Sequence, residues 1–137
     1  MLTLTDEMKD LLKNNLCYIA TASPDGMPCV APKSCRFTDD GRLYYIEWAG
    51  RITYGNLKAN PRIAISTCSA DKKTSYRFEG KAEILTSGEL FEKENTRRQE
   101  KGKRPVIAIV MVDVEAVYDM GKKNPGGLVA SSSPPHS

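Results

Sequence analysis

The sequence has few of the side chains from which enzymes usually build an active site. It contains a single histidine, His136, which is the penultimate of 137 residues. Without a histidine in a folded segment, a Ser-His-Asp or Cys-His arrangement for nucleophilic catalysis is not expected. Glycine-rich nucleotide loops of the GxGxxG or GxxxxGKS/T type are also absent. If the chain performs chemistry, we therefore expect a bound cofactor to supply it.

Cysteine is scarce too, and its spacing argues against a metal site. The cysteines form no CxxC pair, and the lone histidine cannot complete a zinc site of the Cys/His type. All of them lie in segments with the pattern of strands, where cysteine behaves as a small buried hydrophobe. We expect inert core thiols, with a redox role as the alternative. These residues are Cys17, Cys29, Cys35 and Cys68.

Long apolar runs and a strong excess of one charge are missing as well. No segment approaches the roughly 18 apolar residues that a membrane-spanning helix needs, and residues 1–15 lack the basic and apolar regions of a secretory signal. We therefore expect a cytoplasmic protein with no membrane partner. The net charge of +3 is modest, and the basic residues are interleaved with 17 acidic ones. This pattern favours small anions such as phosphates over nucleic acid as partners.

Two helices are predicted in the first half of the chain. Residues 5–15 repeat apolar side chains at helical spacing, and Thr5 is placed to cap that helix. Residues 53–60 predict a short helix with Thr53 as its cap. Pro61 ends it, because a residue that precedes proline avoids the helical conformation.

A third helix is predicted over residues 86–101. Thr86 and Glu89 have the spacing of a capping box at its start. The body of the helix is almost entirely charged, so we expect it to lie on the surface. Acids and bases alternate along it, which favours a solvated face over a surface that binds nucleic acid.

The other patterned segments predict strands, because they are apolar throughout or alternate apolar with polar residues. They are residues 16–22, 29–37, 42–48, 62–69, 75–86 and 106–118. The turn sequences SPDG and TDDG separate the first three. Gly80, inside the fifth, indicates a bulge or the close approach of another backbone. Six short strands joined by tight turns favour a mainly β fold, a small antiparallel barrel with flanking helices.

The composition divides the chain into one domain and a tail. Residues 1–121 carry all of the predicted helices and strands and have the size of a single domain. Residues 122–137 are rich in Gly, Ser and Pro. We therefore expect a C-terminal tail that is mobile beyond Leu128.

One segment, residues 48–57, has the features of an anion-binding site at the start of the predicted short helix. The N-terminus of a helix offers unpaired N–H groups and a partial positive charge. Thr53 would add a hydroxyl, Arg51 a guanidinium fork that matches phosphate, and Gly50 room for the backbone to come close. Taken alone, the segment is equally compatible with a capped helix that carries a surface arginine.

Several short motifs follow one another along the chain. After the opening helix come ATA at residues 20–22, DGMP at 25–28, VAPKS at 30–34, LYYI at 43–46, TYGNL at 53–57, NPRIA at 60–64, FEGKAE at 78–83 and a last strand over 110–118. In this order and spacing, over roughly residues 5–121, the chain resembles the pyridoxamine 5′-phosphate oxidase-like family of FMN-binding split barrels.

The resemblance implies a six-stranded antiparallel split β-barrel that forms a homodimer, with two FMN sites at the subunit interface. The FMN phosphate would be held by the turn at Arg51 and Thr53 and near Asn56. Residues implied to lie along the ring or the ribityl chain are Ala31, Pro32, Lys33, Ser34, Trp48 and Ala49. Ile52 stands where the family often has lysine, so Arg51 would supply the missing charge. Lys33 is a second source of positive charge or simply an exposed strand lysine.

The function implied by the resemblance is that of an FMN-binding flavoprotein, an oxidoreductase or an electron carrier. A true pyridoxamine 5′-phosphate oxidase is not expected, because the region after the last strand lacks the further substrate-binding arginines of those chains. A deazaflavin-dependent reductase of the same fold is one alternative, whereas a haem site is disfavoured because His136 in a tail is a poor axial ligand. The other alternative is a non-enzymatic small-barrel module that binds oligonucleotides through Tyr44, Tyr54 and Tyr76.

Overall fold

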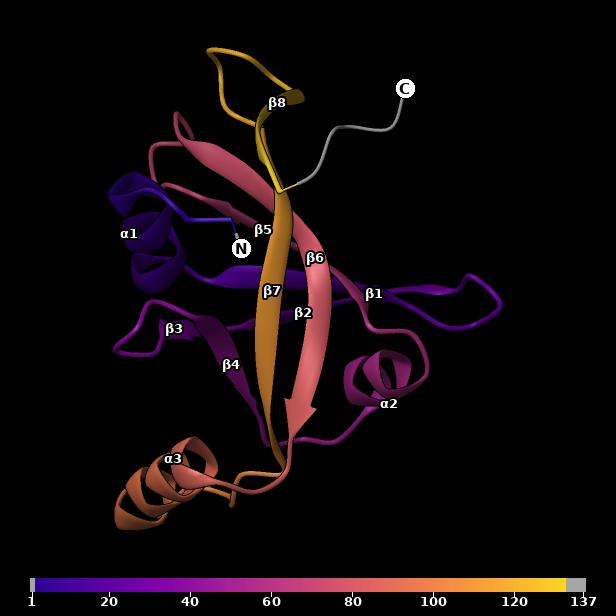
Figure 1. The fold of residues 1–137 in the computed structure, drawn as a ribbon, viewed down its shortest axis with the longest axis vertical. Helices are drawn as coiled ribbons and strands as arrows, with labels where there is room; N and C mark the ends of the chain where they lie inside the picture. The colour runs from indigo at the N-terminus through magenta and orange to yellow at the C-terminus, as the bar shows by residue number, and fades with distance from the viewer. Residues whose placement is uncertain (1, 133–137) are drawn as a thin grey trace.

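The computed structural model describes residues 2–132 as a curled antiparallel sheet with helices around it (Figure 1). The helices are α1 (Asp6–Asn14), α2 (Ile52–Ala59) and α3 (Glu89–Glu100). The strands are β1 (Cys17–Ala22), β2 (Pro28–Lys33), β3 (Cys35–Phe37), β4 (Leu43–Glu47), β5 (Arg62–Cys68), β6 (Ser75–Leu85), β7 (Ala108–Asp119) and β8 (Gly127–Ser131). In Figure 1, α3 and β8 lie at opposite ends of the molecule.

The order of the strands explains how the sheet becomes a barrel. The strands are hydrogen-bonded in the order β2-β1-β5-β6-β7-β4-β3, and every neighbouring pair is antiparallel. The two strands at the ends of this order, β2 and β3, are separated in the chain only by Ser34. The sheet therefore curls until its two ends meet at one residue, which gives the predicted split barrel.

The strand count differs from the predicted six for two reasons. The segment predicted as one strand over residues 29–37 divides at Ser34 into β2 and β3, which lie at opposite ends of the sheet. In addition, β8 forms within the segment predicted to be a tail. Both differences arise from long-range pairing rather than from local sequence pattern.

Burial follows the pleat of the strands. In β5 the side chains of Ile63, Ile65 and Thr67 are buried, while those between them face outward. β4 is buried at all five positions because both of its faces are covered. The second covering layer comes from α3, whose Leu90 and Phe91 pack against a small cluster on the outer face of the sheet. That cluster consists of Tyr44, Ile46, Val106, Ile109 and Met111.

The helix caps agree with the prediction only for α1. The Thr5 side chain accepts a hydrogen bond from the Met8 N–H at 3.2 Å, as expected for an N-cap. α2 begins one residue earlier than predicted, with Arg51 at its N-cap, so the prediction that Thr53 caps it was wrong. α3 begins at Glu89 with Gly88 at its N-cap and no side-chain cap, so the predicted capping box at Thr86 does not form.

The C-terminal segment is more ordered than predicted. Only residues 108–112 of β7 pair with β4, so the rest of that edge of β7 is open. β8 fills part of it, since Ala116 to Asp119 pair with Ser131 to Gly127. The prediction that the tail is mobile beyond Leu128 was therefore wrong up to Ser131, because a long strand with an open edge recruits a partner. Residues 133–137, including His136, lie outside the described residues.

The cysteines fit the predicted core role only in part. Cys17 and Cys35 are buried, Cys29 is half-buried, and Cys68 at the end of β5 is exposed. All four are free thiols. The prediction of a core position was wrong for Cys68, because its alternating strand turns that position outward.

Candidate functional site

The start of α2 combines an open helix end with an exposed arginine. The chain leaves β4 at Glu47 and turns at Gly50, whose φ of 67° is in the left-handed region. The helix begins with the bond from the Gly55 N–H to the Arg51 carbonyl at 3.0 Å, and Arg51 makes no side-chain bond to the helix. Arg51 and Ile52 are both exposed. The positive end of α2 therefore remains accessible to an anion from solvent.

Two other predicted phosphate ligands join α2 to the barrel. Thr53 is buried, and its Oγ1 lies 3.7 Å from the Sγ of Cys29 in β2. Asn56 is buried as well and donates from Nδ2 to Thr21 Oγ1 in β1 at 3.1 Å. These contacts hold the helix against β1 and β2. Of the three predicted phosphate ligands, Arg51 is thus the one with an exposed side chain, whereas Thr53 and Asn56 are buried.

β2 presents a backbone edge that is not used by another strand. Among residues 2–132 it pairs with β1 alone and stands at one end of the strand order. Pro28 and Pro32 carry no N–H, which suits positions whose backbone groups point away from the partner strand. Among the predicted ring-binding residues, Ala31 and Lys33 are half-buried, whereas Pro32 and Ser34 are exposed. This edge can hydrogen-bond a planar polar ligand.

Glu47 lies between these two features, and the sequence analysis did not identify it. It is only 1% exposed, and its Oε2 accepts bonds from Lys33 Nζ at 3.3 Å, from the Ala49 N–H at 3.0 Å and from the Gly50 N–H at 3.1 Å. The Lys33 ammonium also lies 5.6 Å from the ring centroid of Tyr45. Lys33 is therefore ion-paired, with a side chain that is only 12% exposed, and not an exposed strand lysine. The sequence did contain a signal for this residue, because Glu47 is a carboxylate at the end of an otherwise apolar and aromatic strand.

Two buried polar atoms next to this ion pair have no hydrogen-bond partner among the described residues. They are Glu47 Oε1 and the hydroxyl of Tyr45. Burial, with the Glu47 carboxylate nearby, raises the pKa of Tyr45 above its usual range, so the phenol stays protonated. Buried polar atoms without a partner are rare in folded proteins, so each of the two is a candidate contact for water or a polar ligand.

Trp48 faces α3 rather than the ion pair. The guanidinium groups of Arg98 and Arg104 lie 5.5 and 5.9 Å from its ring centroid. Arg98 also donates from Nε to the Arg104 carbonyl at 2.6 Å. The ring is 41% exposed. As the only tryptophan in the chain, Trp48 is a fluorescence reporter placed directly before the candidate anion site.

The structure thus joins the segments of most predicted site residues at one junction and leaves the Trp48 ring outside it. β2 meets the start of α2 through Lys33, Glu47 and Ala49 and through the Cys29–Thr53 contact. Trp48 stands apart, against the basic end of α3.

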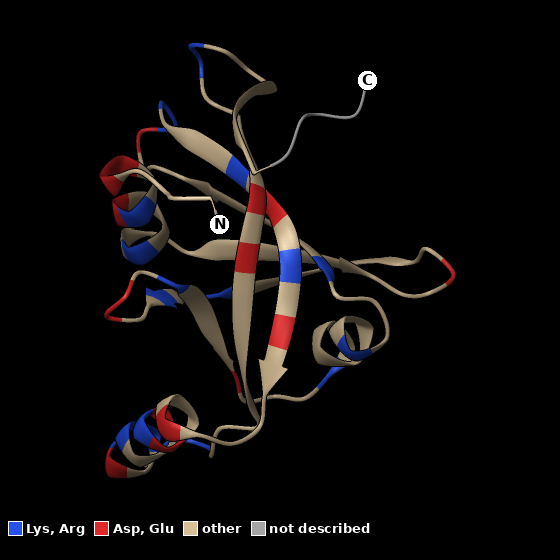
Figure 2. Ribbon diagram, viewed as in Figure 1, with Lys and Arg blue, Asp and Glu red and all other residues tan. Residues whose placement is uncertain are grey.

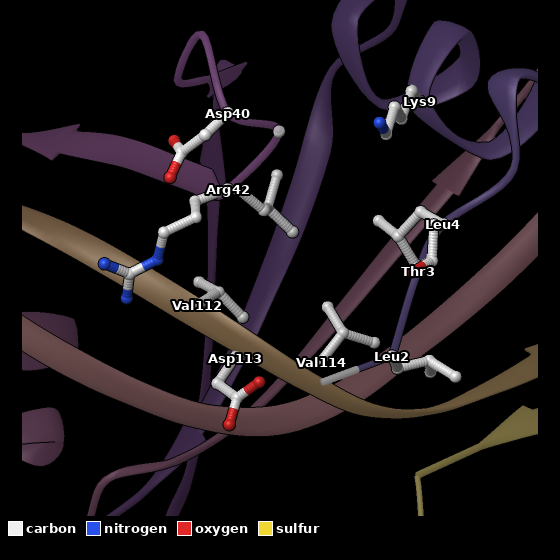
Figure 3. Close-up of a pocket in the computed structure, with 11 residues that line it drawn as sticks. Leu2, Thr3, Leu4, Lys9, Asp40, Arg42, Val112, Asp113 and Val114 are labelled. Atoms are coloured by element: carbon white, nitrogen blue, oxygen red, sulfur yellow. The ribbon is translucent and has the colours of Figure 1, made fainter.

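Two hollows are found among the described residues. The pocket in Figure 3 has a volume of about 120 Å³ and lies between residues 2–4, the turn before β4, and β7. Lys9, Asp40 and Arg42 contribute charges of both signs there, and none of the predicted site residues lines it. A groove of about 740 Å³ is lined by residues of β1, β5, β6, β7 and β8, among them Thr21, the partner of Asn56. The first is too small for a cofactor, since ligand pockets usually exceed about 300 Å³.

Several other sites find no support in residues 2–132. No group of three His, Cys, Asp or Glu side chains could hold a metal ion there, and no helix in that range is long and apolar enough to cross a membrane. Tyr44, proposed as an exposed aromatic for oligonucleotides, is buried. Figure 2 shows acidic and basic residues interleaved along α3 and β6. The geometry does not favour the oligonucleotide-binding alternative.

Known proteins share both the sequence and the fold of this chain. A curated relative, the uncharacterized protein MJ0282 of Methanocaldococcus jannaschii, is 31% identical over 134 residues, which is 93% of this chain and 88% of that protein. The solved structure of HupZ from Group A Streptococcus is 30% identical with a TM-score of 0.81, over 93% of this chain and all 100% of that one. A pyridoxamine 5′-phosphate oxidase-like structure from Lactobacillus delbrueckii is 31% identical with a TM-score of 0.72, over 85% of this chain and 93% of that one.

More distant solved structures share the fold alone. They include an F420 reductase, 22% identical with a TM-score of 0.65 over 83% of this chain and 98% of that one. An FMN-binding protein from Syntrophomonas wolfei is 15% identical with a TM-score of 0.65, over 83% of this chain and 84% of that one. A family model for pyridoxamine 5′-phosphate oxidase matches residues 4–120. The chain therefore belongs to the pyridoxamine 5′-phosphate oxidase family of flavin-binding split barrels.

Proposed function

We propose that this protein binds FMN and acts as an oxidoreductase or electron carrier that is related to pyridoxamine 5′-phosphate oxidase without being one. The observation that carries the proposal is the open N-terminus of α2, with Arg51 exposed beside it and the free edge of β2 next to it. This arrangement combines a site for a phosphate with a site for a planar polar ring.

The donor set at α2 suits a phosphate dianion. Arg51 provides a guanidinium fork, and the first turn of the helix provides N–H groups that no N-cap side chain satisfies. The N–H groups of Ala49 and Gly50 already bond Glu47. The backbone donors that remain for a phosphate are therefore the N–H groups in the first turn of α2. We therefore assign the phosphate to Arg51 and the first turn of α2, with Thr53 and Asn56 supporting the helix.

The ring would lie along Ala31 to Ser34, where the outer edge of β2 can bond its polar rim. Lys33 would bring a positive charge to that rim, held by Glu47. When bound, FMN supplies hydride and electron transfer, which the side chains of this protein do not. No side chain in the junction is an obvious general base, so a simple reductase or an electron carrier is the function that suits the site.

We also propose that the protein is a homodimer. Apolar side chains stand on the outer face of β1 and β2, where Tyr18 is 48% and Val30 is 63% exposed. Tyr18 pairs with Pro32, and Ala20 with Val30, so these residues form one continuous surface. Exposed patches of this kind usually mark interfaces. A second copy over this surface would lie beside the proposed ring site.

The test is a visible absorbance spectrum of the purified protein after incubation with FMN and gel filtration. We expect flavin bands to co-elute with the protein. Because an F420 reductase has the same fold, a parallel incubation with a deazaflavin decides between the two cofactors by the position of the retained absorbance band. A protein that retains neither would contradict the proposed function.

A further inference from the structure

Glu47 connects the two halves of the proposed cofactor site. One oxygen, Oε2, accepts bonds from the Ala49 and Gly50 N–H groups of the turn and from Lys33 Nζ of β2. The turn leads into the open end of α2, and β2 carries the proposed ring site. In the described part of the chain, no other hydrogen bond links the 48–50 turn to β2.

The Glu47 carboxylate is only 1% exposed, so its charge needs compensating partners. Moving a charge out of water carries a large free-energy cost unless paired and hydrogen-bonded groups compensate it. Here a single oxygen receives all three bonds, while Oε1 has none from the described residues. The carboxylate also lies near the site proposed for a phosphate, where its charge would repel the ligand. The Lys33 ammonium at 3.3 Å offsets that charge.

The turn itself depends on this arrangement. Gly50 adopts a left-handed φ of 67°, and a Cβ built there would lie 2.9 Å from Cδ1 of Ile107. The two N–H groups that bond Glu47 are consecutive, so they fix the direction in which the chain enters α2. Arg51 follows directly and is exposed.

We propose that Glu47 is the positioning residue of the cofactor site, and this inference rests on the proposed function. Its carboxylate holds the 48–50 turn so that Arg51 and the first turn of α2 face the ligand phosphate. The same oxygen fixes the Lys33 ammonium on β2, and Lys33 neutralises the carboxylate so that it does not oppose anion binding.

Three substitutions separate these roles. Glu47→Gln retains an amide oxygen that can accept from Ala49 and Gly50, but it removes the charge. Glu47→Ala removes both the acceptor and the charge. Lys33→Met keeps the bonds to the turn and leaves the carboxylate uncompensated. Glu94→Gln is the matched control, because Glu94 is also fully buried and ion-paired, with Arg36 and Arg97 at 3.5 Å, yet it belongs to α3.

The readouts are FMN and riboflavin affinities, measured by quenching of Trp48 fluorescence, and amide exchange of the ligand-free protein. We expect Glu47→Ala to weaken FMN binding about 10- to 100-fold, equivalent to the loss of about one charge-assisted hydrogen bond to the phosphate, and to speed exchange at Ala49 and Gly50. Glu47→Gln should preserve the slow exchange and most of the FMN affinity. Lys33→Met should weaken FMN more than riboflavin, because only FMN carries the repelled phosphate. Glu94→Gln should lower the melting temperature without changing FMN affinity.

The outcomes distinguish this inference from the proposed function. A wild-type protein that binds neither flavin overturns both. Normal FMN binding by the wild type together with unchanged binding by Glu47→Ala overturns the positioning role alone. An equal loss of affinity in Glu94→Gln would show that Glu47 acts only through general stability. If Glu47→Ala does not fold, a Lys33→Met protein that binds FMN like the wild type overturns the role of the ion pair.

Discussion

Gly80 lies at a point in β6 where the structure leaves no room for a side chain. A Cβ at this position would lie 1.9 Å from the backbone oxygen of Asp113 in β7. The register of the two strands shifts between Glu79 and Gly80, which is the bulge that the sequence predicted. The cause is steric, since the two backbones approach each other too closely for any Cβ.

Gly80→Ala is therefore expected to destabilise the protein by about 3 kcal/mol, because the overlap is with backbone and cannot be relieved by a rotamer change. Gly55→Ala is the control. A Cβ at Gly55 in α2 would meet nothing within 4 Å, so alanine should raise stability by about 0.5–1 kcal/mol through helix propensity. Urea denaturation of both variants checks the pair, and similar effects in the two would contradict the steric account.

Single residues show what the sequence could predict about the site. Arg51, Lys33 and Thr53 were predicted as site residues from residue type and motif; the structure places Thr53 against β2 and Lys33 against Glu47, and their role in binding stays a prediction. Glu47 was missed because its role depends on the approach of β2 to the end of β4, a contact between segments far apart in the chain. The buried roles of Thr53 and Asn56 were missed for the same reason, since partners in β1 and β2 engage their side chains.

At the level of helices, capping was predictable only where the chain before the helix is extended. Thr5 lies in extended conformation and caps α1. Gly88 before α3 has a φ of 106°, a conformation that glycine adopts readily and threonine does not. The start of α3 is thus set by its packing on the barrel through Leu90 and Phe91, which local spacing does not reveal.

Thr5→Ala and Thr86→Ala test this distinction between two threonines that both had the pattern of a cap. Loss of the Thr5 bond to Met8 should cost about 1 kcal/mol and lower the melting temperature by about 3–5 °C. Thr86→Ala should change stability by less than about 0.5 kcal/mol, because the residue is exposed and outside the helix. Thermal unfolding of both variants is the measurement. An equal loss of stability in the two would contradict this distinction and support the predicted capping box at Thr86.

At the level of strands, neither β8 nor the division at Ser34 could be predicted from the local sequence pattern. β8 has few strand-forming residues and follows a Gly-rich stretch, so its composition indicates a tail. It is a strand because β7 extends past β4 and offers an open edge. The chain breaks at Ser34 because the barrel must close there, which is a property of the whole sheet.

At the scale of the whole molecule, the apolar surface of β1 and β2 predicts self-association. Val30→Lys would place a charge at its centre, which costs several kcal/mol if a second copy covers it. We expect the wild type to sediment as a dimer and Val30→Lys as a folded monomer with weaker FMN binding. Lys93→Glu, a charge change on exposed α3, serves as the control and should leave the dimer intact. A monomeric wild type would contradict the dimer.

In the proposed site, the open end of α2 with Arg51 holds the phosphate of a flavin. The most direct measurement compares the dissociation constants of FMN and riboflavin by quenching of Trp48 fluorescence, in the wild type, in Arg51→Gln and in the remote control Arg42→Gln. We predict that FMN binds the wild type at least about 10-fold more tightly than riboflavin, as expected for a charge-assisted phosphate contact. Arg51→Gln should remove most of that difference, and Arg42→Gln should leave it unchanged. Equal affinities for FMN and riboflavin in the wild type would contradict the account.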